Sequence, residues 1–237
     1  MPGSFKTEAV VLRSIRFGEA DRVLHLYSAT RGRIGAIAKG SRRPRSRFGG
    51  RLEPFFRLDL VLHEGRGDLS TVTAASTVDG YGGLRASGPA LTAGARACDA
   101  VLRLLDEAQP NTAAYSLLCR YLTLLDSGAG TELSEALAFR IKLALVAGFA
   151  PELASCARCG EGENLVAFSG AAGGVVCGAC EQGGFSVGEE AHRFMVEALG
   201  RPLSEAPSAS AQALRQAERA ISETLEYHAH VRLRSAA

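Results

Sequence analysis

The sequence contains no tryptophan, and only three of its 27 basic residues are lysines. No apolar run approaches the roughly 18 residues of a membrane-spanning helix, so we expect a soluble chain. There is no G-x-x-x-x-G-K-[ST] motif, which argues against an ATP motor of that type. The five histidines show no metal-ligand spacing, and no nucleophile-plus-base constellation stands out. These absences make an enzyme the least supported class, and we expect none.

The sequence also lacks a long apolar segment near its beginning, so we expect no secretory signal peptide. Cys98 and Cys119 fall at apolar positions of helical segments, where free buried thiols fit a reducing cytoplasm. A hydrophobic content of 46% with 22% charged residues is ordinary for a globular protein. The expected location is therefore the cytoplasm.

The net charge of +2 hides an asymmetry between the two parts of the chain. Residues 1–80 carry 14 basic and 8 acidic residues, a net of +6, whereas residues 81–237 carry 13 and 17, a net of −4. A basic N-terminal part joined to an acidic C-terminal part indicates that the N-terminal part binds a polyanion.

The first 80 residues read as a small barrel. Alternating apolar and polar residues, separated by turn signals, predict five short strands and no intervening helix, at residues 7–16, 21–29, 33–39, 56–63 and 69–78. This pattern is typical of an antiparallel barrel, and the OB-fold is its five-stranded version, which commonly binds oligonucleotides or oligosaccharides.

From about residue 81 the apolar period becomes helical. The expected helices begin at caps formed by Ser87, by Asn111, by Thr131 or Ser134, and by a capping box at Ser186–Glu189, with a last helix after a linker at 202–210. The fold class is thus α+β and multidomain. An OB-fold domain at 1–80 precedes a helical domain at 81–237, which holds a zinc-binding segment at 152–184.

Two Cys-x-x-Cys pairs form the strongest motif, with seventeen residues between Cys159 and Cys177. Each pair can aim two sulfurs at one point, and two pairs complete a tetrahedron around a metal ion. Two disulfides or a redox pair are the alternatives, and a closed four-sulfur site leaves no position for catalysis. We expect one structural zinc ion, with the ligands Cys156, Cys159, Cys177 and Cys180.

A basic segment lies between the third and fourth expected strands. Six positive charges and no acid fall within residues 39–51, a density that favours contact with a phosphate backbone. We expect a mobile, exposed arm. Candidate stacking aromatics are Phe17, Tyr27, Phe55, Phe56 and, as the best exposed candidate, Phe48. The candidate DNA-binding residues are Lys39, Arg42, Arg43, Arg45 and Arg47, with Arg31, Arg33 and Arg51 less central.

The segments Thr30–Arg43 and Ser46–Phe48, the opening Thr7–Leu12 and Phe17–Asp21, and the later cysteine pairs resemble the RecO family of bacterial DNA repair proteins. The resemblance covers essentially the whole chain. It implies an OB-fold, a helical domain with zinc as a scaffold, and a nucleoid-associated protein. It also implies binding of single- and double-stranded DNA, strand annealing, and work with RecR to load RecA onto strands coated by single-stranded DNA-binding protein.

By the same resemblance, the helical domain would dock the acidic C-terminal tail of that coating protein, and the basic helical residues Arg120, Arg140 and Lys142 are candidates for the contact. Two other readings stay open. An OB-fold module that binds RNA or the ribosome would need the same positive charge. A protein-interaction adaptor could instead bind an acidic peptide through the basic segment.

Overall fold

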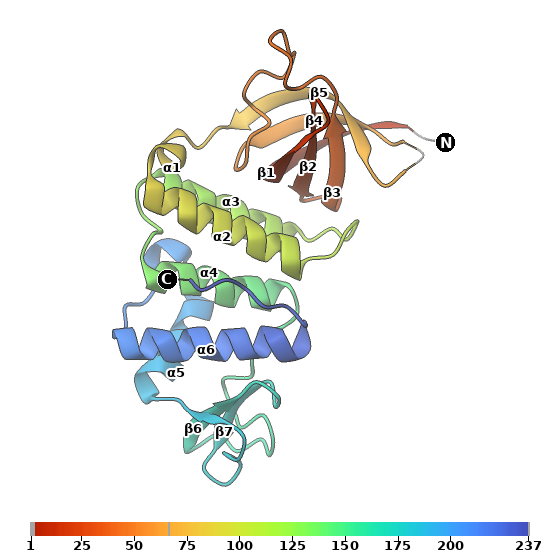
Figure 1. Cartoon of the computed structure of the whole chain (residues 1–237). Coiled ribbons are helices and arrows are strands. Elements are labelled where there is room, and N and C mark those ends of the chain that lie inside the picture. The colour runs from red at the N-terminus through yellow and green to blue at the C-terminus, as the bar shows by residue number, and fades with distance from the viewer. Residues whose placement is uncertain (1–2, 66, 237) are drawn as a thin grey trace. The chain divides into compact units, whose positions relative to one another are not determined.

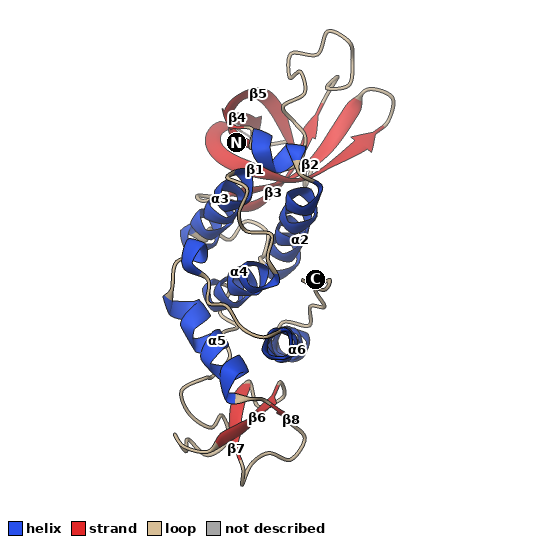
Figure 2. Cartoon of the chain, turned by 90° about the vertical axis from the view of Figure 1, so that its left-hand side faces the viewer, coloured by secondary structure: helices blue, strands red, loops and turns tan. Residues whose placement is uncertain are grey.

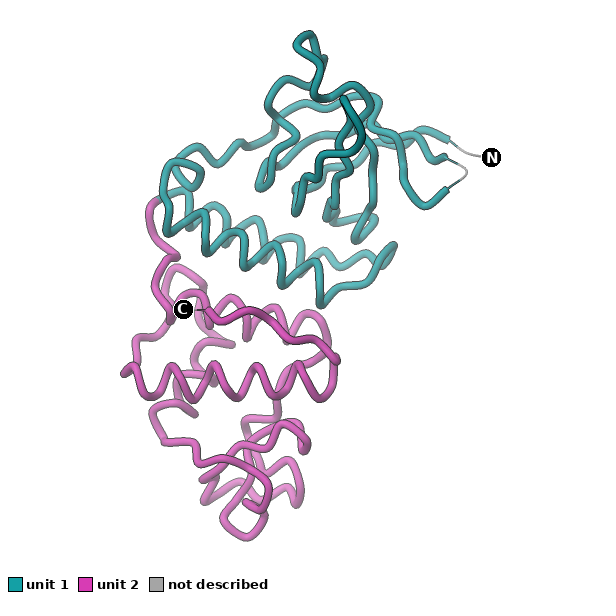
Figure 3. Tube along the Cα trace, in the orientation of Figure 1, with its two compact units in different colours: residues 1–127 teal, residues 128–237 magenta. Residues whose placement is uncertain are grey.

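A computed structural model describes residues 3–65 and 67–236 of the chain. The chain forms two compact units, residues 1–127 and residues 128–237 (Figure 3). Each unit has its own secondary structure, so the two are described separately. Within the described residues, no helix combines the length and the apolar character needed to cross a membrane.

The first unit begins with a closed five-stranded barrel of strand order β1-β2-β3-β5-β4 (Figure 1). This closed five-stranded barrel confirms the expected OB-fold. All pairs are antiparallel except the short β3–β5 pair that closes the barrel. The strands are β1 (Ser4–Phe17), β2 (Asp21–Ser28), β3 (Gly32–Ala38), β4 (Arg57–His63) and β5 (Ser70–Asp79).

Strand β1 is long enough to pair on both sides. Its first half pairs with β4 and its second half with β2, with a bulge between Val11 and Arg13. A bulge bends a strand, which lets β1 pass from one neighbour to the other around the barrel. The alternation in β4 buries Leu58, Leu60 and Leu62 in the interior, as the sequence pattern predicts.

Residues 39–56, between β3 and β4, differ from the expected free arm. Phe48 and Leu52 are only 1% and 2% exposed and belong to the core of the barrel. The expectation that Phe48 is exposed was therefore wrong. The segment is polar on average, but its two large apolar residues are drawn inward because burying them removes apolar surface from water.

Two arginines fasten this segment to the barrel. Arg47 donates to the Val72 carbonyl at 3.4 Å, and Arg51 donates to the Ala75 carbonyl at 3.0 Å. Strand β5 pairs with β3 only at Ser70 and Thr71, so these later carbonyls lie where β3 no longer reaches. These two hydrogen bonds tie the segment to β5.

Three helices complete the first unit: α1 (Gly82–Ala86), α2 (Gly88–Leu104) and α3 (Thr112–Asp126). The side chains of Ser87 and Asn111 cap α2 and α3 as expected. Helix α3 packs on the barrel through Tyr115, whose hydroxyl donates to Glu8 at 2.6 Å and whose ring lies 6.4 Å from that of Tyr27. The barrel and helices α1–α3 therefore form one compact body.

The second unit combines helices with a small sheet of order β7-β6-β8 (Figure 2). Helix α6 follows the expected linker and is capped by the Ser210 side chain, which accepts from the Ala213 amide. The elements are α4 (Leu133–Val146), β6 (Leu165–Ser169), β7 (Gly174–Cys177), β8 (Phe185–Ser186), α5 (Glu189–Gly200), the 3₁₀ helix η1 (Leu203–Glu205) and α6 (Ala211–His228).

Two expected helix caps in this unit were wrong. Helix α4 is capped at Glu132, whose amide donates to the Glu135 carboxylate at 3.0 Å, and not at Thr131 or Ser134. Helix α5 is capped at Gly188, because Ser186 belongs to β8 and pairs with Ala167. A strand pairing therefore overrides the local capping signal.

We expect Phe48→Ala to destabilise the chain by about 3–5 kcal/mol, because it empties a buried position of the barrel core. Urea unfolding followed by circular dichroism measures the change. The control is Phe17→Ala, which removes the same side chain from a site that is 55% exposed and should change stability by less than about 0.5 kcal/mol. Equal stabilities for the two variants would contradict the placement of Phe48.

Candidate metal centre and basic surface

The four cysteines lie on two tight turns beside the small sheet. In the first turn the Gly160 amide donates to the Cys156 carbonyl at 2.8 Å, and Gly160 has a φ of 81°. In the second turn, at the end of β7, the Cys180 amide donates to the Cys177 carbonyl at 2.9 Å. A glycine favours the left-handed conformation that the first turn requires.

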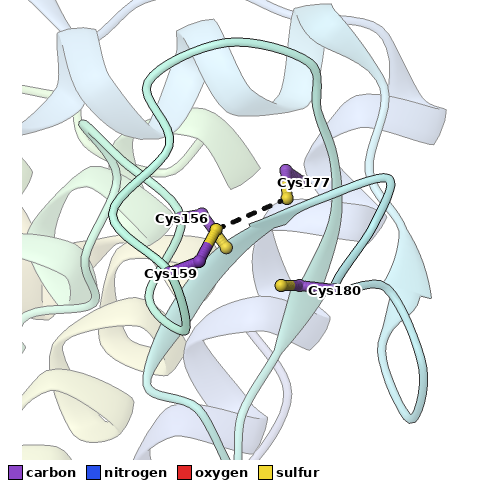
Figure 4. Close-up of side chains that lie close together, drawn as sticks. All are labelled: Cys156, Cys159, Cys177 and Cys180. Atoms are coloured by element: carbon purple, nitrogen blue, oxygen red, sulfur yellow. Dashed lines mark hydrogen bonds between the residues drawn. The ribbon is translucent and has the colours of Figure 1, made fainter.

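These turns bring all four sulfurs together. The four Sγ atoms lie within 4.8 Å of one another, and the Cys159 and Cys177 sulfurs are 3.7 Å apart (Figure 4). All four cysteines are free, so the structure does not support the disulfide alternative. Four convergent thiols are a donor set that fits a metal ion.

The electrostatics of the cluster also favour a cation. The backbone amide of Cys177 and those of Arg158 and Cys159 lower the pKa of Cys156 to about 6. Hydrogen bonding to the Cys159 sulfur raises the pKa of Cys180 to about 12. If all four thiols ionised, the thiolates would repel one another at these distances, and a bound cation would remove that repulsion.

Side chains around the cluster hold its turns to the rest of the second unit. Arg158 donates to the Cys180 carbonyl at 3.0 Å and so ties one turn to the other. The His192 ring on α5 is 2.7 Å from the Leu153 carbonyl, and the His228 ring at the end of α6 is 2.8 Å from the Gly170 carbonyl. No local sequence pattern predicts these three contacts, since the two partners of each lie far apart along the chain.

The two cysteines outside the cluster are buried, as expected. Cys98 lies on α2 and Cys119 on α3, and burial raises the pKa of the Cys98 thiol to about 12. A buried thiol with a raised pKa is a poor nucleophile and a poor metal ligand.

The basic segment presents most of its cations to solvent. Within residues 3–65 and 67–236, none of the five central candidates forms an ion pair with a carboxylate. Arg51 is half-buried against β5. In Figure 1 the loop between β3 and β4 projects from the end of the barrel opposite α2 and α3. The exposed set is Lys39, Arg42, Arg43, Arg45 and Arg47.

Arg31 and Arg33 are engaged within the first unit. Arg31 pairs with Glu64 at 3.1 Å and lies 4.1 Å from the ring centroid of Phe5. Arg33 donates to the Leu102 carbonyl and lies 3.6 Å from Glu107. These contacts give Arg33 a structural role at the end of α2.

The candidate aromatic residues separate clearly by burial. Tyr27, Phe48 and Phe55 are buried, and Phe56 is partly covered by the Arg85 guanidinium, 4.5 Å from its ring centroid. Phe17 at the end of β1 remains 55% exposed.

Two of the three basic helical candidates have internal partners. Arg140 is 3.5 Å from Glu218 and also donates to the Arg234 carbonyl. Lys142 donates to the Leu199 carbonyl at 2.8 Å, and burial lowers its pKa. Arg120 is exposed on α3. Arg140 and Lys142 thus help to hold the helices of the second unit together.

Comparison with known proteins agrees along the whole length of the chain. The family model "Recombination protein O N terminal" matches residues 1–81, and "Recombination protein O C terminal" matches residues 85–237. A protein named "DNA repair protein RecO" from Rubrobacter xylanophilus is 39% identical over 226 residues, which covers 91% of this chain and 90% of the relative.

Two further relatives carry the same name. The protein from Anaeromyxobacter dehalogenans is 35% identical over 96% of this chain and 92% of its own length. The protein from Nocardioides is 35% identical over 98% of both chains.

We expect Cys177→Ser to lose the bound metal ion and to lower the unfolding temperature of the full chain, because metal binding supplies folding free energy to a segment with little core of its own. Elemental analysis and differential scanning calorimetry measure the two effects. Cys98→Ala is the control, since Cys98 is buried outside the cluster and its loss should leave the metal content unchanged. A metal content that is equal in both variants would contradict the site.

Proposed function

The chain belongs to the RecO family of DNA repair proteins, and from this premise we propose that it is a recombination mediator. In this role it binds single- and double-stranded DNA and anneals complementary strands. Together with RecR it helps to load RecA onto single strands coated by single-stranded DNA-binding protein.

The observation that carries the proposal is a set of exposed cations on the OB-fold barrel that form no ion pair with a carboxylate of the described residues. Lys39, Arg43 and Arg45 are exposed, and so are Arg42 and Arg47, which also donate to backbone carbonyls of the barrel, while Phe48 and Leu52 fix the segment in the barrel core. Each guanidinium that neutralises a phosphate releases a condensed counterion, and this release supplies binding free energy without reading the base sequence.

Annealing by such a surface needs no catalytic residue, and we propose that the protein is not an enzyme. Two strands repel each other through their phosphates, and cations on the barrel reduce that repulsion. A strand held through its phosphates keeps its base edges free to pair with a complement.

The proposed protein partners follow from the family and from charge. We propose RecR as a partner because of the family, and we assign no surface of this chain to it. The acidic C-terminal tail of the single-stranded DNA-binding protein requires basic residues, and Arg120 is the exposed one among the three helical candidates. The proposed location is the cytoplasm, in association with the nucleoid, where buried thiols such as Cys98 stay reduced.

We further propose that the metal ion is zinc and that its role is structural. Zinc–sulfur bonds of about 2.3 Å in a tetrahedron place the sulfurs about 3.8 Å apart. The 3.7 Å separation of the Cys159 and Cys177 sulfurs fits this geometry. With four sulfur donors the site has no open position for a water or a substrate, so the ion would hold the two turns together.

Changing Arg42, Arg43, Arg45 and Arg47 to alanine should weaken DNA binding and flatten its salt dependence. If all four contact phosphates, the slope of log K against log salt for single-stranded DNA should fall by about 3. Fluorescence anisotropy of labelled oligonucleotides at several salt concentrations measures the slope. Annealing of complementary oligonucleotides should slow in the same variant.

The control variant changes four exposed arginines of the second unit to alanine and so removes the same total charge; its salt slope should stay unchanged. These residues are Arg193, Arg201, Arg215 and Arg232. An unchanged slope in the first variant would remove the basic segment from the proposal.

Competition between single-stranded DNA and structured RNA tests the RNA-binding alternative, which predicts that RNA displaces the DNA. An adaptor for acidic peptides would show no affinity for DNA at physiological salt.

Elemental analysis of the purified chain should give about one zinc ion per chain. Another metal at that stoichiometry would leave the cluster as a metal site but would contradict the zinc assignment.

A further inference from the structure

The chain ends in an extended segment that turns back over the second unit. Helix α6 ends at His228, and His230 has a φ of 55°, a conformation that residues other than glycine adopt only rarely. The Val231 amide then donates to the Leu225 carbonyl at 3.1 Å, so the chain reverses its direction. In Figure 1 the segment runs back from the end of α6 alongside α4. We call residues 230–236 the C-terminal strap.

The strap packs on the unit through its apolar side chains. Val231 and Leu233 are half-buried and Ala236 is 8% exposed, whereas Arg232 and Arg234 are exposed. An extended chain places successive side chains on opposite sides, so the two arginines stand in solvent. The strap joins neither sheet of the described residues, and its backbone therefore lacks the hydrogen-bond ladder of a strand pair. A segment held in this way can open without unfolding the helices beneath it.

The end of the strap lies on a buried ion pair. Arg140 on α4 is 6% exposed and lies 3.5 Å from Glu218 on α6. The Arg140 guanidinium also donates to the Arg234 carbonyl. The Glu218 carboxylate accepts from the Ser235 hydroxyl at 2.9 Å and from the Ala236 amide. The pair thus binds the backbone of an extended chain, with one group for its carbonyl and the other for its amide.

The strap offers Arg140 a weaker partner than a carboxylate. A guanidinium binds a carboxylate through two parallel N–H groups and with opposite full charges, whereas a backbone carbonyl is neutral. An extended segment of another protein that places a carboxylate at this position therefore competes with the strap. Its backbone amides can replace those that Glu218 now binds, and its apolar side chains can replace Val231 and Leu233.

We propose that the C-terminal strap is autoinhibitory: it covers a peptide-binding surface on α4 and α6 until an acidic segment of a partner protein displaces it. The partner segment is the acidic tail of the single-stranded DNA-binding protein. This inference rests on the proposed docking of that tail and adds its regulation. Arg120 is exposed in the structure, whereas Arg140 becomes available only when the strap leaves.

The charge of the strap favours an acidic competitor. Arg232 and Arg234 are exposed, and the Arg232 side chain is 87% exposed although it lies 3.5 Å from Glu226. Exposed cations attract an acidic segment to the strap before it reaches the surface beneath. A basic segment would be repelled at the same place, so the strap admits one class of partner and excludes another.

A chain that ends at Ala229 tests the strap against a labelled peptide that copies the acidic tail. If the strap is closed in about 90% of chains, its removal should tighten peptide binding about tenfold, because the surface is then always open. Fluorescence anisotropy measures the affinity. A control peptide, in which every aspartate and glutamate is replaced by asparagine or glutamine, should gain nothing from the deletion.

The full-length variant Leu233→Ala keeps the test valid if the deletion lowers the stability of the second unit. It removes an apolar contact of the strap and leaves Arg140 and Glu218 in place, so it should also tighten peptide binding, by less than the deletion. The matched control is Leu91→Ala, which removes a leucine that is 37% exposed on α2 and should bind the peptide as the wild type does.

Hydrogen exchange shows directly whether the peptide displaces the strap. In the wild-type chain saturated with the acidic peptide, residues 230–236 should exchange faster, because the Ala236 amide no longer donates to Glu218. Equal peptide affinity of the wild type, the deletion and Leu233→Ala, or unchanged exchange of the strap in the bound chain, would overturn the autoinhibitory role and leave tail docking in place. A peptide that binds none of these chains would overturn both, whereas DNA binding by the basic segment would stand on its own salt-slope test.

Discussion

The barrel interior must be filled, and part of the filling comes from the segment that carries the positive charge. Phe48 and Leu52 pack with Leu24, Leu58 and other core residues, so the basic segment cannot leave the barrel without exposing apolar surface. The cations between β3 and β4 are thus carried by a folded loop. A fixed loop loses less conformational entropy on binding a partner than a free tether does.

The cysteine-bearing segment of the second unit also has to be held in place, but it has little apolar core of its own. Its small sheet packs few apolar residues around Cys156 and Cys177, and four convergent sulfurs take the place of a larger core. Backbone carbonyls that accept from His192 and His228 join this segment to the helices on which those side chains lie. The cluster therefore stabilises the shape of a unit, whereas the cations of the first unit face solvent.

Local patterns predicted most of the secondary structure because short-range preferences decide it. The five barrel strands follow alternation, and Ser87, Asn111 and Ser210 cap helices because a serine or asparagine oxygen can accept from free amides of the first turn. The capping box expected at Ser186 failed, since a strand pairing with Ala167 took that residue. Long-range pairing can outweigh a capping preference of about 1 kcal/mol.

The amino-acid sequence alone determined the strand and helix periods, the cysteine spacing and the density of charge at residues 39–51. Only the tertiary structure decided which of these side chains are free. It buried Phe48, left Phe17 in solvent, and engaged Arg33 with the Leu102 carbonyl while Arg42 remained exposed. The physical reason is that exposure and pairing depend on groups far away along the chain, and no local pattern records which distant groups the fold brings together.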